Sequence, residues 1–237
     1  TEVVKDLPEK QYGGTHLVPD DPESPIGVWL DMNPKQAAQY KRMEKAALLE
    51  IAGEPDMPVN GILAEMTRLK QIADSVVNLN GSEIVDATGD SNKIDWILEF
   101  LEEREDGKII VASQFTKFIY ALSKVLNEKG IGHYLLTGKQ NDRERKEAQD
   151  GFQKDGGHRV FLLNTKAGGV SLTLDMADDV VVCDKTYNPD DQEQVEDRAH
   201  RVSRMHNVTI WNLCSRGTID EQMAIINAER ESSAKAV

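Results

Sequence analysis

The chain of 237 residues contains only two cysteines and no long apolar run. Cys183 and Cys214 both lie in apolar stretches, so we expect buried, reduced thiols in a reducing compartment rather than a disulfide framework. No apolar run approaches the roughly 20 residues that span a bilayer, and no basic stretch followed by an apolar one opens the sequence. We therefore expect neither a membrane partner nor a secretion signal.

Positive charge is also scarce. The chain has 28 Lys and Arg residues against 41 Asp and Glu residues, which gives a net charge of −13. This balance argues against a general polyanion-binding protein, because the surface as a whole repels phosphate groups. Any contact with nucleic acid must come from a local basic face or from a partner domain.

The sequence lacks a phosphate-binding P-loop and the spacing of a metal site. The nearest match to a P-loop starts at Gly132, but it has five residues between its glycines where the motif needs four, and Gln140 replaces the Ser or Thr that would hold Mg²⁺. The five histidines and two cysteines are not spaced as zinc ligands. Asp184 follows an apolar run as a magnesium ligand would, but Lys185 stands where an ATPase usually has Glu. We therefore predict no metal held by this chain.

The apolar segments that are present predict an α/β fold. From Gly107 onward, short apolar runs alternate with helical patterns of about 10 to 15 residues, which is typical of a parallel sheet flanked by helices. The predicted strands are 108–112, 132–136, 159–163, 179–183 and 208–213.

Three parts are expected along the chain. Residues 1–30 mix prolines, glycines and acids, and are interpreted as an extended linker segment. Residues 31–106 are expected to be an all-helical subdomain, with a polar connection at 78–92. Residues 107–237 are expected to form the α/β domain.

Parallel sheets bind ligands beyond the carboxyl ends of their strands, so the loops after the predicted strands share one edge. Gly168 and Gly169 would let the backbone approach a ligand closely, although plain turn chemistry is the alternative. Thr165 and Lys166 add a hydroxyl group and a cation beside them.

A charged helix is expected at 188–204, NPDDQEQVEDRAHRVSR. Gln194, Arg198 and Arg201 are spaced so that all three face the same way on a helix. Two guanidinium groups on one face suit a phosphate, which accepts paired hydrogen bonds from Arg. An exposed helix with ion pairs such as Asp197 with Arg201 is the alternative.

Taken together, these segments resemble the second RecA-like lobe, or helicase C-terminal lobe, of a superfamily-two helicase, and specifically the Swi/Snf type of DNA-dependent ATPase and translocase. The matching segments are KIIVASQF at Lys108, FLLNTKAGGVSLTL at Phe161, DRAHRVSR at Asp197 and GTIDEQM at Gly217, with LAEMTRLKQIADS at Leu63 in the first third. Val202-Ser203-Arg204 departs from the family's usual Ile-Gly-Gln, which leaves the subfamily open.

The resemblance implies an ATP-driven motor that works on duplex DNA. ATP and Mg²⁺ would be bound mainly by an N-terminal RecA-like lobe of the same protein, whose P-loop this chain lacks, so the chain alone is expected to be inactive. Arg198 and Arg201 would act as arginine fingers. The residues implied to bind ATP are Gln194, Gly168 and Gly169, and those implied to bind DNA are Ser113, Gln114, Arg145, Thr165 and Lys166.

Other functions remain open at this point. The chain could be a stand-alone, non-enzymatic module that binds nucleic acid or a protein, or a lobe of an RNA helicase or a restriction motor. A small-molecule enzyme of the doubly wound class is a further alternative, although no glycine-rich turn follows Val111. We expect a cytoplasmic protein of a bacterial or viral system, or a nuclear one if the source is eukaryotic.

Overall fold

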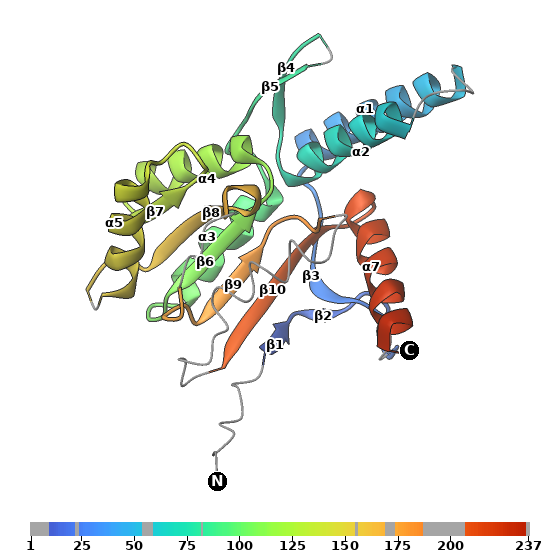
Figure 1. The fold of residues 1–237 in the computed structure, drawn as a ribbon. Coiled ribbons are helices and arrows are strands. Elements are labelled where there is room, and N and C mark those ends of the chain that lie inside the picture. The colour runs from blue at the N-terminus through green and yellow to red at the C-terminus, as the bar shows by residue number, and fades with distance from the viewer. Residues whose placement is uncertain are drawn as a thin grey trace.

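The computed structural model shows a mainly parallel sheet with helices on both faces (Figure 1). A helical hairpin and a β-hairpin project from it. The residues that the structure describes are 10–21, 24–53, 59–81, 83–154, 156–168, 174–186 and 207–235.

Five parallel strands form the centre of the sheet, in the order β10-β9-β6-β8-β7. The strands are β6 (Ile109–Ser113), β7 (His133–Leu136), β8 (Val160–Asn164), β9 (Asp179–Val182) and β10 (Val208–Ser215). Ile109 in the middle strand lies opposite Val160 on one side and Asp179 on the other. The predicted parallel sheet flanked by helices is therefore confirmed.

Helices bury both faces of this sheet, which explains why its strands are continuous apolar runs. The covering helices are α3 (Asn92–Glu103), α4 (Thr116–Glu128) and α5 (Asp142–Gln153). Val111 points into the face covered by α3 and α4, and its neighbour Ile110 points into the face where Phe152 of α5 packs. A capping box begins α5, because Asn141 and Glu144 exchange side chain to backbone hydrogen bonds of 2.9 and 3.0 Å.

The first third of the chain contains two long helices, α1 (Pro34–Gly53) and α2 (Val59–Asp74), which lie side by side and extend away from the sheet (Figure 1). The last helix, α7 (Ile219–Lys235), packs beside α2. Buried Tyr40 of α1 ties the two regions together, because its hydroxyl accepts a hydrogen bond of 2.8 Å from the backbone N–H of Ile219.

The expectation of an all-helical first third is wrong at the connection after α2. This connection contains an antiparallel hairpin of β4 (Val77–Asn80) and β5 (Glu83–Ala87). The reason is visible in the alternation: Val77 is buried while Asn78 and Asn80 are exposed, which is the period of a strand. Asn80-Gly81 then supplies a hairpin turn, with Gly81 at a φ of 62°.

The first 30 residues contribute strands to the sheet. β1 (Lys10–Gly13) and β3 (Ile26–Leu30) both pair in parallel with β10, and β2 (Thr15–His16) pairs with β3. The segment interpreted as a linker therefore extends the β10 side of the sheet, while the domain limits at residues 30 and 106 stay predictions. Within the described residues, no helix has the length and apolar content that crossing a membrane requires.

Candidate functional site

The carboxyl ends of β6, β8 and β9 meet at one edge of the sheet, as the fold class requires. Asn164, the last residue of β8, joins the two neighbouring loops. Its Nδ2 donates to the carbonyl of Gln114 at 3.0 Å, and its Oδ1 accepts from the backbone N–H of Lys166 at 3.0 Å. The structure thus brings two of the predicted DNA-binding residues together, through a bridging residue that sequence reasoning missed.

Gln114 also connects β6 to the exit of β9. Its backbone N–H donates to Asp184 Oδ1 at 3.2 Å, and its Nε2 donates to the carbonyl of Lys185 at 3.4 Å. Asp184 is completely buried, and its Oδ2 has no hydrogen-bond partner among the described residues. Ser113 is buried as well, and its Oγ accepts from the backbone N–H of Phe115 at 3.0 Å. A contact with DNA would require the Ser113 side chain to leave this turn.

The turn after β8 carries the other predicted binding residues. Thr165 and Gly168 begin and end the 3₁₀ turn η1 (Thr165–Gly168), and Lys166 is exposed within it. The Thr165 hydroxyl is buried and has no partner among the residues that the structure describes. This edge therefore presents a solvent-facing cation, Lys166, next to a hydroxyl group that is buried.

Arg145 lies apart from this cluster, on α5. Its Nε donates to the carbonyl of Gln140 at 2.9 Å, and its Nη1 is 3.9 Å from Asp142 Oδ1. Its side chain is 20% exposed. The remaining predicted site residues, Gln194, Arg198, Arg201 and Gly169, lie outside the described residues, as does the predicted helix at 188–204.

A buried lysine was not predicted from the sequence. Lys93 lies at the start of α3 with no exposed surface, and its Nζ donates to Asp74 Oδ1 at 2.6 Å, to Asp220 Oδ2 at 2.7 Å and to the carbonyl of Cys183 at 2.7 Å. Burial by itself would lower the pKa of Lys93, but the two carboxylates outweigh it and raise the pKa above its ordinary value. Asp74 and Asp220 lie in two segments that carry the family resemblance, but only the fold shows that they meet.

A second lysine approaches the same strand exit. Lys70 of α2 is almost completely buried, and its Nζ donates to the carbonyl of Lys185, which also receives the Gln114 amide. Burial lowers the pKa of Lys70, and the nearby carboxylates of Asp184 and Asp74 partly offset this.

The cysteines behave as the sequence predicts. Cys183 and Cys214 are both buried and free. Burial raises the pKa of the Cys214 thiol to about 12, so it stays protonated at neutral pH. Neither thiol is therefore a candidate nucleophile or metal ligand. Among the described residues, no group of three or more His, Cys, Asp and Glu side chains is arranged to hold a metal ion.

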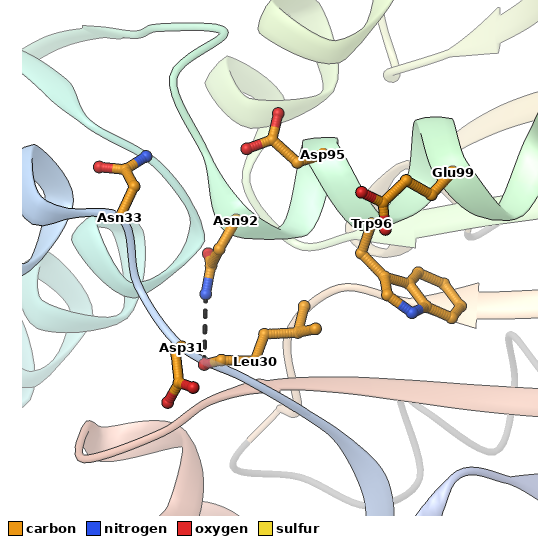
Figure 2. A pocket seen from close by; sticks show the side chains of 7 residues that line it. All are labelled: Leu30, Asp31, Asn33, Asn92, Asp95, Trp96 and Glu99. Carbon is orange, nitrogen blue, oxygen red and sulfur yellow. Dashed lines mark hydrogen bonds between the residues drawn. The ribbon is translucent and has the colours of Figure 1, made fainter.

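A pocket of about 220 Å³ lies between the end of β3 and the start of α3 (Figure 2). Its lining residues are Leu30, Asp31, Asn33, Asn92, Asp95, Trp96 and Glu99. Burial and the carboxylates of Asp90 and Glu99 raise the pKa of Asp95. Because its carboxylates would repel a phosphate, this pocket is not a candidate site for ATP or for the DNA backbone.

Comparisons with known proteins agree with the fold. Residues 92–203 match the helicase conserved C-terminal domain family. The ATP-dependent helicase fft2 of Schizosaccharomyces pombe is 40% identical to this chain over 134 residues, which are 56% of this chain and 10% of that protein. The chain therefore spans about a tenth of the length of that relative.

Two solved structures have the same fold. The Sulfolobus solfataricus SWI2/SNF2 ATPase core in complex with dsDNA is 26% identical, with a TM-score of 0.74 over 97% of this chain and 46% of that chain. The C-terminal part of the Fun30 ATPase domain is 20% identical, with a TM-score of 0.72 over 92% of this chain and 88% of that chain. Residues 92–203 therefore match the helicase conserved C-terminal domain family, and the chain is similar in sequence and fold to Swi/Snf-type ATPases.

Proposed function

We propose that this chain is the second motor lobe of an ATP-dependent DNA helicase or translocase. It would act with an N-terminal RecA-like lobe of the same protein, which would hold most of ATP and its Mg²⁺. The described residues include neither a P-loop nor a cluster of carboxylates that fits a metal ion. The role of this chain would be to complete a nucleotide site rather than to form one, so the chain alone would be inactive.

The observation that carries the proposal is the exit of β9. Cys183, Asp184 and Lys185 are held at the carboxyl edge of the sheet, and the sequence that follows them contains the paired arginines of DRAHR. Ligands of parallel sheets bind at this edge. Arg198 and Arg201 would there stabilise the charge that develops on the γ-phosphoryl group, with Gln194, Gly168 and Gly169 near the nucleotide.

The DNA contact would come from the turn after β8. Lys166 is exposed there, beside Thr165, whose buried hydroxyl has no partner among the described residues, and beside the Asn164 bridge to Gln114. An exposed cation suits the phosphate backbone, whose contacts carry no sequence information and so suit a motor that moves along any duplex. Thr165 would join this contact if its hydroxyl turned outward. Arg145 would add a more distant contact, and Ser113 would support the turn.

The test is ATP hydrolysis by the full-length protein that contains this chain, with and without duplex DNA. We expect DNA to stimulate hydrolysis, and Arg198→Ala or Arg201→Ala to lower the stimulated rate by about 10³-fold or more, because arginine fingers contribute on the order of 10³ to 10⁵. Arg143→Ala is the matched control, since Arg143 is an exposed arginine paired with Glu147 at 2.8 Å. An ATP hydrolysis rate that DNA does not stimulate, or that stays unchanged when both arginines are replaced, would contradict the proposal.

A further inference from the structure

Two buried lysines hold the backbone at the point where β9 ends. Lys93 of α3 donates to the carbonyl of Cys183 at 2.7 Å, and Lys70 of α2 donates to the carbonyl of Lys185. These two carbonyls lie on either side of Asp184. Neither lysine belongs to the parallel sheet itself, so the end of this strand is fixed by helices packed beside its edge.

The charge of each lysine is accommodated at the same place. Lys93 contacts Asp74 and Asp220 at 2.6 and 2.7 Å. Burial lowers the pKa of Lys70, and the carboxylates of Asp184 and Asp74 offset part of this change. A charged donor makes a stronger and shorter hydrogen bond to a carbonyl than a neutral one does. Both lysines are therefore suited to hold a short piece of backbone in one position.

We propose that Lys70 and Lys93 are positioning residues for the arginine fingers, because they fix the strand exit that leads into the segment containing Arg198 and Arg201. This inference rests on the proposed function. A displacement of about 1 Å at a reacting group can cost on the order of 100-fold in rate, so the position of the strand exit matters, since Lys185 lies 13 and 16 residues before the two arginines. The placement of α2 would then set the alignment of the arginines.

The chain provides a matched control at the opposite edge of the sheet. Lys108 precedes β6, and its Nζ donates to the carbonyls of Phe152 and Lys154, the latter at 2.6 Å. Like Lys70, it places an ammonium group on backbone carbonyls, but it is less buried and lies at the amino end of the strands. Lys108→Met should therefore show how much activity is lost when such a lysine–carbonyl contact is removed far from the exit of β9.

The experiment compares Lys70→Met with Lys108→Met in the full-length protein. We expect Lys70→Met to lower the DNA-stimulated kcat for ATP by about 10- to 100-fold, and Lys108→Met to change it less than about threefold, at comparable thermal midpoints of unfolding. A loss of activity in Lys70→Met no larger than in Lys108→Met would overturn the inference.

A double-mutant cycle separates positioning from general destabilisation. If Lys70 acts through the arginines, Lys70→Met should cause almost no further loss in an Arg201→Ala background. Independent losses that multiply would mean that Lys70 does not act through Arg201, and the inference would be wrong.

Hydrogen exchange gives a readout that does not depend on hydrolysis. In the full-length protein, amides 183–186 should exchange faster in Lys70→Met than in the wild type or in Lys108→Met. If the wild type hydrolyses no ATP, the proposed function fails, and this measurement alone then tests whether Lys70 holds the exit. Unchanged exchange at 183–186 would overturn that claim too.

Discussion

At the scale of single residues, Lys93 shows how a charge is stabilised inside this protein. Its ammonium group has no exposed surface and uses all three of its donors, on two carboxylates and one carbonyl. Asp220 Oδ2 additionally accepts from the backbone N–H of Ser215 at 3.1 Å. The cluster joins α2, α3, β9 and α7, so its loss would affect four elements at once.

Replacing Lys93 should therefore be severe for stability. Lys93→Met leaves Asp74 and Asp220 buried without their cation, and removing one partner of a buried ion pair typically costs about 3 to 5 kcal/mol. Urea denaturation followed by circular dichroism measures this change in the free energy of unfolding. Lys124→Met is the control, because Lys124 is 78% exposed and lies 4.0 Å from Glu128. Equal stability of the two variants would show that the cluster does not stabilise the fold.

At the scale of elements, the β4–β5 hairpin shows how a short pattern determines local structure. Val77 of β4 and Ile84 of β5 are both buried, and the turn between the two strands contains Gly81 with a φ of 62°. The hairpin is also held from outside, because Lys117 of α4 donates to the carbonyl of Ile84. The turn is therefore a place where backbone conformation alone can be tested.

Gly81→Ala tests the turn without adding a steric clash. A Cβ atom at Gly81 would have no atom within 4 Å, so the cost arises only from the left-handed backbone, about 1 to 2 kcal/mol. Gly53→Ala, at the end of α1, is the control: a Cβ there also meets nothing within 4 Å, and Ala favours a helix over Gly. We expect thermal unfolding to show a lower midpoint for the first variant and an equal or higher midpoint for the second. A Gly81→Ala protein as stable as the wild type would contradict this account of the turn.

At the scale of the whole molecule, the charge balance means that the proposed DNA contact would be local. The chain carries a net charge of −13, so most of its surface repels a duplex. At the carboxyl edge, Lys166 is an exposed cation that could meet a phosphate group. A binding mode of this kind depends on few contacts, and each should have a measurable effect.

Lys166→Ala should weaken DNA binding by the full-length protein uniformly across sequences. Removing one phosphate contact should reduce the slope of log affinity against log salt by about 1. Fluorescence anisotropy with two unrelated duplexes at several salt concentrations measures both effects. Lys124→Ala, which removes an exposed lysine from α4, should leave the slope unchanged. An unchanged slope for Lys166→Ala would remove this residue from the proposed interface.

Much of the fold followed from the sequence because its signals are local. The runs at 109–113 and 160–164 are almost continuously apolar, which is the pattern of strands buried on both faces. The capping box at Asn141 depends on residues three positions apart. The hairpin at 77–87 was missed although its alternation and its Asn80-Gly81 turn are equally local signals. Strands at 10–30 were missed for a different reason, since their partner β10 is nearly two hundred residues away.

The sequence by itself therefore determined the fold class, the identity of the polar residues at the carboxyl edge and the family resemblance, because each depends on short-range patterns. Only the tertiary structure decided which side chains meet. Asn164 joins Gln114 to Lys166, and Lys93 joins two aspartates that lie 146 residues apart in the chain. Such contacts depend on how strands and helices stack, and no spacing along the sequence records that.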